Sequence, residues 1–360
     1  MSKSFLVPTG SIIREYLIEY GFTQKEACQR LGISEKHFSN VINGNSRLTE
    51  EFALKLENLL PVPASYWLNI EIKYREYLAR VNQEAELTKL DLKSIAKRFR
   101  FSEVFHGLDW SIERQANEML KLLKINSFES FEKVYDVIPA RFMEDGGQKE
   151  AIAIWLNMCE KEIDLQNNIP EGTKFSICKL KKDLEEFKCL ALNDNVSRAF
   201  LNCRKLCNKN GINLVVVEAL SGCKVRGVIT MKKGVPTIYL SGRFKTHDHI
   251  WFAFMHEIGH LLKHFNSQDM IISDDKFDLS IENEANVFAR DFFVNRSSYE
   301  KFIQKKQFSV SDIVSFAKTQ DVLPGIIVAF LQHDKQISNS AFANLKIRFD
   351  INDVKLELGW

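Results

Sequence analysis

The clearest candidates for chemistry lie in residues 255–260, where His256, Glu257 and His260 form an HExxH motif inside an apolar run. Two histidines four residues apart lie on the same face of a helix, so both imidazoles can bind one ion. Glu257 lies on the adjacent flank, where it can accept a proton from a water whose pKa zinc lowers to about 7. The alternative interpretation of this motif alone is a plain helix with two surface histidines.

A third zinc ligand is predicted in a second helix, within residues 281–293. A catalytic zinc usually takes three protein ligands and keeps one position for water. At about 100° per residue, Glu282 and Asn286 lie at the edge of the apolar side of this helix, whereas Glu284 lies on the solvent side. The small residues Ala285 and Ala289 on this side permit another helix to approach closely. We therefore assign Glu282 as the third ligand, and we expect Glu284 to be a solvated charge.

Two further residues border this predicted site. Asn286 lies one turn after Glu282 and is expected either to hydrogen-bond a ligating histidine or to be an ordinary surface amide. His264 continues the histidine series by four residues, but the metzincin pattern needs glycine where this chain has Lys263. We therefore expect His264 not to bind the zinc directly.

Length and charge bound the class of protein. A chain of 360 residues predicts two to three domains, and a hydrophobic share of 45% is ample for packed cores. The formal net charge of +2 does not indicate a nucleic-acid or membrane partner. Any DNA binding must therefore come from a local element.

The cysteines and the N-terminal segment favour a cytoplasmic protein. The seven cysteines form no CxxC pair and no disulfide framework, which favours a reducing compartment. Arg14 and Glu15 interrupt the segment where a signal peptide would be apolar, and no run of about twenty apolar residues follows. We expect a cytoplasmic location and no membrane partner.

Five short helices are predicted in residues 1–80, and the second and third form a helix-turn-helix. Thr23 and Glu26 form a capping box before the second helix, and Gly32 supplies the turn. The expected helices are Ser11 to Tyr20, Gln24 to Leu31, Ser34 to Ile42, Thr49 to Leu60, and Ala64 to about Arg80.

In this motif the first residues of the second helix meet base edges in the major groove. A helical bundle that binds no DNA is the alternative. The expected DNA-binding residues are Gln24, Ser34, Glu35, Lys36, His37, Ser39 and Asn40, with Asn43, Asn45 and Arg47 as phosphate contacts.

The segment from Leu31 through Asn69, including Asn43-Gly44, Leu48-Thr49 and Tyr66-Trp67-Leu68-Asn69, resembles the HigA-like, antitoxin-type repressors of the XRE family. The resemblance implies operator binding. A homodimer is also expected, because helix-turn-helix proteins commonly read two half-sites.

The remaining chain is predicted as a helical connecting region over 81–207 and a domain over 208–360. From Asn213 the period changes to that of β-strands, expected at 214–218, 225–230 and 237–240. An exposed edge of this antiparallel sheet could hold an extended peptide across the metal. The expected fold class is α+β, mainly helical, with a zincin-like C-terminal domain whose small antiparallel sheet packs on the HExxH helices.

Residues 213–334 resemble the ImmA/IrrE family of metallopeptidases, through the strands with Gly227 and Pro236, the HExxH helix, the Glu282 helix and the segment from Pro324 to Gln332. The resemblance implies a Zn²⁺-dependent endopeptidase that cleaves or antagonises a DNA-binding repressor. By position it gives His256, His260 and Glu282 as zinc ligands and Glu257 as general base.

This chain departs from the family pattern at two positions. Asn295 stands where proline is frequent, and Leu323 where histidine is common. These changes leave the zinc ligands intact, but no oxyanion donor is assigned. The unranked candidates are Arg226, Arg243, Tyr299 and His333.

The sequence therefore predicts a DNA-binding transcriptional regulator with a zinc endopeptidase domain whose substrate is a regulatory protein such as a repressor. The alternative is a HigA-like antitoxin of a toxin–antitoxin pair. In that case the peptidase-like half is a non-catalytic sensor or a platform that binds a partner such as a toxin.

Overall fold

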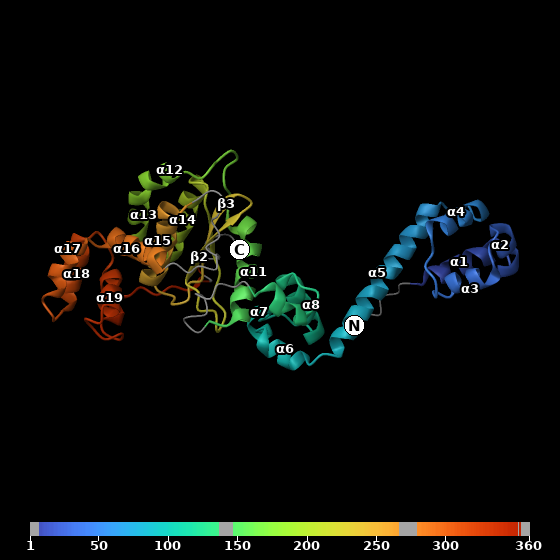
Figure 1. The fold of residues 1–360 in the computed structure, drawn as a ribbon, viewed down its shortest axis with the longest axis horizontal. Helices are drawn as coiled ribbons and strands as arrows, with labels where there is room; N and C mark the ends of the chain where they lie inside the picture. The colour runs from blue at the N-terminus through green and yellow to red at the C-terminus, as the bar shows by residue number, and fades with distance from the viewer. Residues whose placement is uncertain (1–6, 137–146, 266–278, 352, 354–360) are drawn as a thin grey trace. The chain divides into compact units, whose positions relative to one another are not determined.

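The computed structural model describes residues 7–136, 147–265, 279–351 and 353, and the chain divides into two compact units (Figure 1). The first unit holds the chain up to Lys93 together with Ser111–Glu113, and the second holds the remaining residues. Within the described ranges, no single helix is long and apolar enough to cross a membrane; one bent pair, Val310–Thr319 with Pro324–His333, passes by length and composition.

The first unit is a bundle of short helices whose starts follow the predicted capping signals. Thr23 and Glu26 form the expected capping box, and Gly32 ends the second helix in the left-handed conformation. Ser34 and Thr49 cap the next two helices. Trp67 is fully buried at the centre of the core. The helices are α1 (Thr9–Glu19), α2 (Gln24–Leu31), α3 (Glu35–Ile42), α4 (Glu50–Leu59) and α5 (Ala64–Thr88).

Two of the predicted helix bounds in this unit are wrong. α1 begins at Thr9 rather than behind Ser11, and its N-cap residue Pro8 makes no side-chain hydrogen bond to the helix. α5 continues to Thr88 instead of ending near Arg80. No glycine or proline interrupts the added turns, so nothing in the local sequence breaks the helix.

The second unit is mainly helical, as expected, and carries one small sheet. Its elements are α6 (Leu92–Arg98), α7 (Phe101–Val104), α8 (Ile112–Leu123), η1 (Phe128–Ser130), α9 (Phe131–Val134), α11 (Lys149–Gln166), α12 (Ile177–Lys182), α13 (Leu184–Ala191), α14 (Val196–Lys209), β1 (Asn213–Val216), β2 (Gly227–Lys232), β3 (Val235–Leu240), α15 (His247–Lys263), α16 (Leu279–Phe293), α17 (Arg296–Ile303), α18 (Val310–Thr319), α19 (Pro324–His333) and η2 (Ala343–Leu345).

The sheet is mixed, so the prediction of three antiparallel strands is wrong. The strand order is β1-β3-β2; β2 is antiparallel to β3, whereas β1 is parallel to β3. The two-residue turn Lys233-Gly234 forces the β2–β3 pair to be antiparallel. After β1 the chain crosses to the far edge before forming β2, which leaves β1 running in the same direction as the central strand.

The predicted connecting region and the predicted peptidase domain share one hydrophobic core. Phe187 and Phe200 from the connecting region are fully buried with Trp251 and Phe254 of the HExxH helix. The ring of Phe200 lies 4.8 Å from that of Trp251, and the ring of Phe187 lies 5.3 Å from that of Phe254. The helix that carries the HExxH motif therefore packs against side chains from both regions.

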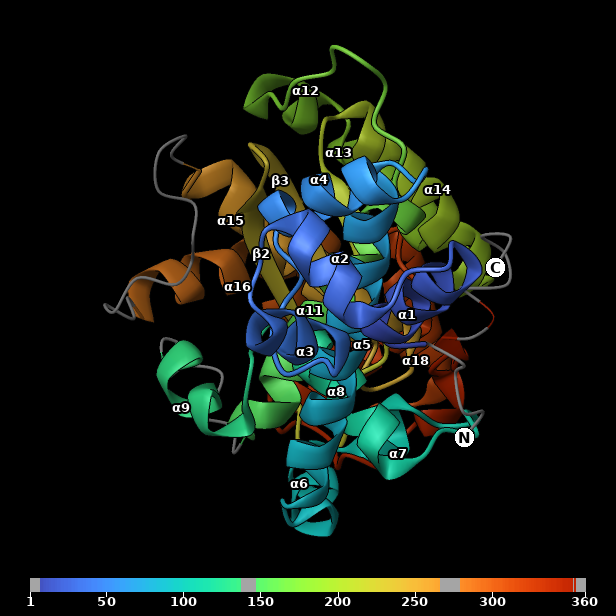
Figure 2. The same cartoon turned by 90° about the vertical axis from the view of Figure 1, so that its right-hand side faces the viewer.

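The two helices with the predicted zinc ligands, α15 and α16, pack directly on each other beside the sheet (Figures 1 and 2). The two helices lie close together at Gly259 of the HExxH motif. A Cβ atom there would lie 3.3 Å from the backbone of Ala285 and 2.9 Å from the ring of Phe288. Glycine at this position thus permits the separation that brings ligands from both helices together.

The first turn of α15 is anchored by His247, whose side chain lies in the interior. Its ring nitrogen Nε2 donates a hydrogen bond to the carbonyl oxygen of Ala191, at 2.8 Å. The residue is 2% exposed, and burial lowers the pKa of His247 from 6.5 to about 4. The neutral imidazole is the form that the fold stabilises.

This anchor predicts an acid-sensitive contribution to stability. Because the folded pKa of His247 lies below the unfolded value, the unfolded chain binds more protons between pH 6.5 and 4, and stability falls as the pH falls through this window. The loss approaches about 3 kcal/mol at pH 4, from 2.5 pKa units at about 1.36 kcal/mol each. The measurement is urea unfolding at pH 7 and pH 4.5 for wild type and His247→Gln, which keeps an N–H donor but does not titrate. An equally steep pH dependence in the variant would contradict this assignment.

Candidate metal centre and nucleic-acid interface

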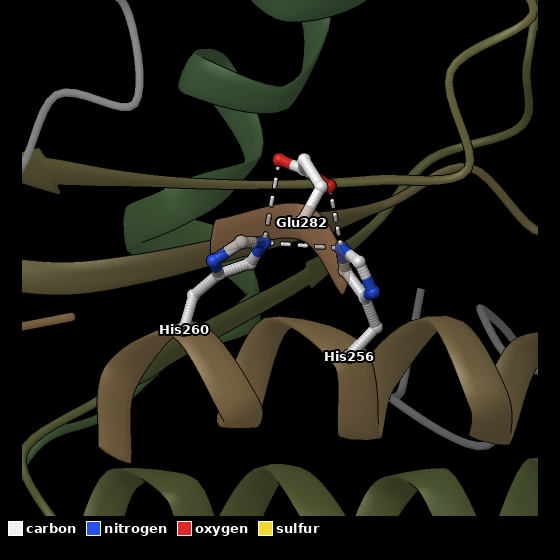
Figure 3. A group of neighbouring side chains, drawn as sticks. All are labelled: His256, His260 and Glu282. Carbon is white, nitrogen blue, oxygen red and sulfur yellow. Dashed lines mark hydrogen bonds and ion pairs between the residues drawn. The ribbon is translucent and has the colours of Figure 1, made fainter. Parts of the chain in front are cut away.

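The structure brings His256, His260 and Glu282 together, as the sequence predicts (Figure 3). The Nε2 atoms of the two histidines lie 3.0 Å apart. A carboxylate oxygen of Glu282 lies 3.2 Å from Nε2 of His256, and the other lies 3.6 Å from Nε2 of His260. Both histidines come from one face of α15, and Glu282 comes from the first turn of α16.

These separations fit a tetrahedral zinc ion. Ligand atoms at about 2.0–2.1 Å from zinc in tetrahedral geometry lie about 3.3 Å from each other. The two Nε2 atoms are 3.0 Å apart, and each lies 3.2 or 3.6 Å from its nearer oxygen of Glu282, so the separations are close to that value. Two imidazole nitrogens and one carboxylate oxygen are also a donor set that zinc uses in catalytic sites.

His256 and Glu282 shift each other's pKa values. Burial opposes ionisation of Glu282, but hydrogen bonds and charge from His256 and His260 hold the pKa of Glu282 well below its usual range. Burial also disfavours protonated His256, yet Glu282 and the nearby Glu257 raise the pKa of His256. The centre thus keeps an anionic carboxylate available for a cation, and a bound metal would replace the proton on His256.

Asn286 lies where it can orient one of the histidines. Its Oδ1 is 3.0 Å from Nδ1 of His256, the ring nitrogen that faces away from Glu282. With Nε2 directed to the metal position, Nδ1 carries the proton and donates it to the amide oxygen. This contact fixes both the tautomer and the rotation of the ring.

The second histidine has a contact of the same kind that the sequence did not reveal. Nδ1 of His260 lies 3.3 Å from Nδ1 of His264, and Nε2 of His264 lies 3.4 Å from a carboxylate oxygen of Glu284. Glu284 is exposed, which confirms the prediction of a solvated charge, and it also lies beside His264. The spacing of four residues between His260 and His264 was the signal that could have indicated this contact.

The contact with Asn286 gives a prediction for metal affinity. Asn286→Ala is expected to weaken zinc binding about 10- to 100-fold, because the His256 ring loses its orienting acceptor. The measurement is competition with a fluorescent zinc chelator. Asn283→Ala is the matched control, since Asn283 is an exposed asparagine on the same helix. Equal affinities of the two variants would show that Asn286 does not support the ligand.

Glu257, the candidate general base, lies beside strand β2. It is 5% exposed. A Cβ atom on Gly227, the first residue of β2, would lie 2.6 Å from Oε1 of Glu257. Only glycine permits the strand to pass this close to the carboxylate, so the sequence places a bare backbone next to the position of the expected chemistry.

The four oxyanion candidates separate into two groups. Tyr299 donates its hydroxyl to Asp334, at 2.9 Å, and Nδ1 of His333 lies 2.9 Å from the same carboxylate. Asp334 is also held by both terminal nitrogens of Arg290, at 2.9 and 2.7 Å. Tyr299 and His333 therefore belong to a network that joins α16, α17 and the end of α19.

Arg226 and Arg243 line a hollow beside the N-terminal half of α15. No oxyanion role follows for any of the four candidates from these contacts.

The predicted DNA-binding residues occupy one region of the first unit. Most are exposed, while Ser39 and Asn40 of α3 are partly buried. Ser34 is engaged as the α3 cap, and its hydroxyl oxygen accepts the backbone N–H of His37. The exposed candidates are Gln24, Ser34, Glu35, Lys36, His37, Asn43, Asn45 and Arg47.

The segment after α3 is fixed by side-chain contacts. The Asn43 amide donates to Ser39, at 3.1 Å, and accepts from Arg14 of α1, at 3.3 Å. Arg14 is an exposed cation next to the expected phosphate contacts and was not among the predicted DNA-binding residues.

Comparison with known proteins supports the first unit. Residues 13–67 match the family model described as Helix-turn-helix, which supports a DNA-binding transcriptional regulator of the XRE type. The match ends within α5. No curated protein and no solved structure matches the chain significantly.

Proposed function

We propose that this protein is a DNA-binding regulator whose second unit is a zinc-dependent endopeptidase. The observation that carries the proposal is the group of His256, His260 and Glu282, whose ligand atoms all lie within 4.8 Å of one another, with Glu257 following His256 on the same helix. The resemblance to ImmA/IrrE metallopeptidases supports the same reaction. The helix-turn-helix match supports operator DNA as the partner of the first unit and fits a cytoplasmic location.

The residues of the centre have separate roles in peptide hydrolysis. His256, His260 and Glu282 hold the metal, which when bound polarises the scissile carbonyl and lowers the pKa of water. Glu257 accepts a proton from the attacking water and delivers it to the leaving amine nitrogen. Because Glu257 is nearly buried, its carboxylate acts in an environment from which bulk water is largely excluded.

Of the two edges of the sheet, the β1 edge cannot accept an extended peptide. At the β1 edge, the N–H groups of Leu214 and Val216 donate to the side chains of Asn167 and Gln166, at 2.8 and 3.0 Å. The carbonyl of Leu214 accepts from Arg204, at 3.0 Å. These side chains occupy the hydrogen-bonding groups that another strand would need, so β1 is closed to strand addition.

The β2 edge is available in the described part of the chain. The N–H of Ser241 donates to the carbonyl of Arg226, so these two residues form a hydrogen-bonded pair of the antiparallel ladder. Every second residue of β2 after Arg226 is then hydrogen-bonded to β3, and the residues between them are not. Backbone groups of Gly227, Ile229 and Met231 consequently point away from β3, and no described residue pairs with them. A peptide added along this edge would lie next to Glu257.

A repressor or antitoxin with a non-catalytic platform is the rival function. The retained Glu257 favours the enzyme, since a platform needs no general base. We infer that the substrate is another regulatory protein, such as a repressor, because the chain joins the candidate peptidase to an operator-binding unit.

The experiment compares newly formed protein N-termini in cells that express wild type or Glu257→Gln. The expected result is a cleaved DNA-binding regulator present only with wild type. Identical sets of N-termini, with both proteins loaded with zinc, would favour the platform.

A further inference from the structure

Two arginines and a histidine surround one exposed aromatic ring near the candidate metal centre. The guanidinium carbons of Arg226 and Arg243 lie 5.4 and 4.9 Å from the centre of the Phe244 ring. The His249 ring stacks on Phe244 with 4.3 Å between ring centres. We call Arg226, Arg243, Phe244 and His249 the arginine–phenylalanine cluster. Phe244 is 39% exposed, so the cluster faces solvent.

The two arginines carry charge that no described carboxylate neutralises. Arg243 donates to the backbone carbonyl of Lys224, at 2.9 Å, and Arg226 has no ion pair within the described residues. Glu218 is paired with Lys245 at 2.6 Å, and Asp248 is paired with both His249 and Lys346 at 2.9 Å. Guanidinium groups held against a ring, with N–H donors left over, form a site for a carboxylate.

The cluster is continuous with the proposed reaction centre. Arg226 directly precedes Gly227, whose backbone lies against Glu257. His249 and Ala253 line the same hollow as the two arginines, and they lie on the α15 stripe that leads to Glu257. At 1.5 Å per residue, Ala253 is about 6 Å and His249 about 12 Å from Glu257 along the helix axis.

We propose that the arginine–phenylalanine cluster binds an acidic side chain of the peptide substrate. This inference rests on the proposed peptidase function and names the substrate class. An extended peptide advances about 3.3 Å per residue, so the acidic residue lies about two to four residues from the scissile bond. Arg226 and Arg243 supply the N–H donors, and Phe244 fixes the planes of the two guanidinium groups.

An acidic peptide fits this surface better than a nucleic-acid backbone does. A polyanion needs a row of cations, whereas the cluster presents two arginines against one ring. The cluster also borders the free β2 edge, which offers backbone hydrogen bonds to a peptide and none suited to bases.

The test is digestion of a peptide pool prepared from a whole proteome, using full-length protein loaded with zinc and mass spectrometry of the products. Wild type is expected to enrich Asp or Glu at one position within four residues of the cleaved bond. A peptide chosen from the products is then compared with its Gln counterpart. For Arg226→Ala and Arg243→Ala, the ratio of kcat/KM between the acidic and the Gln peptide is expected to fall about tenfold.

The ratio is measured within each variant, so a partly unfolded variant does not alter it. Lys233→Ala is the control, because Lys233 is an exposed cation in the β2–β3 turn. Arg226→Glu is expected to shift the preference toward Lys or Arg.

Three outcomes overturn the proposal in different ways. Cleavage without an acidic preference, or with a preference that survives both alanine variants, rejects the cluster as a subsite but leaves the peptidase function standing. A loss of affinity for duplex DNA in Arg226→Ala, with peptide preference unchanged, assigns the cluster to nucleic acid. No cleavage by zinc-loaded wild type rejects the peptidase function, and the subsite with it.

Discussion

Glu257→Gln is expected to abolish peptide hydrolysis while the protein keeps its zinc. Glutamine preserves the shape of the side chain but cannot accept a proton from water. General-base catalysis contributes about 10²- to 10⁴-fold, so kcat should fall by a factor in that range at this nearly buried position. The metal should remain, because the proposed ligands are His256, His260 and Glu282.

The measurement pairs kcat/KM on a peptide substrate with zinc content of the same preparation. Glu186→Gln is the control, since Glu186 is an exposed glutamate whose nearest ion-pair partner is Lys209, at 3.9 Å. If Glu257→Gln cleaved the peptide at the wild-type rate, the reaction would not use Glu257 as its base. If the variant lost zinc as well, the loss of activity could not be assigned to the missing base rather than to the missing metal.

Glu282→Ala is expected to lose the bound metal. The substitution removes one of the three proposed ligands, and the two remaining histidines are expected to bind zinc only weakly. We expect zinc affinity to fall at least about 100-fold, since even loss of a residue that only orients a ligand costs about 10- to 100-fold. Wild type should gain about 4 kcal/mol of stability at a zinc concentration 1,000 times its Kd, and the variant should gain far less.

This result is read by mass spectrometry of metal content and by thermal unfolding with and without zinc. Asp291→Ala is the matched control, because Asp291 is an exposed carboxylate on the same helix. Zinc content and zinc-dependent stabilisation equal to wild type in Glu282→Ala would show that Glu282 is not a ligand.

The candidate site was predictable because it depends on helical periodicity. A spacing of four residues fixes His256 and His260 on one face, and the edge position of Glu282 beside small alanines selects it over Glu284. The capping box at Thr23 is equally local. Each of these features is decided by residues within one or two helical turns, so the sequence contains the relevant information.

The features that were mispredicted or missed depend on residues far apart in the chain. The direction of β1 is set by a crossover, and no local pattern encodes it. Gln166 and Arg204 look like ordinary helix residues, although their side chains close the β1 edge. Arg226 and Phe244 come together only because β2, β3 and α15 meet at one corner of the sheet.

The most direct test of the central claim is digestion of the proteome-derived peptide pool by full-length protein carrying one zinc per chain. The account predicts cleavage that stops when a chelator removes the metal, returns when zinc is restored, and is absent in Glu257→Gln. Cleavage that persists in Glu257→Gln, or no cleavage by wild type with stoichiometric zinc, would contradict it.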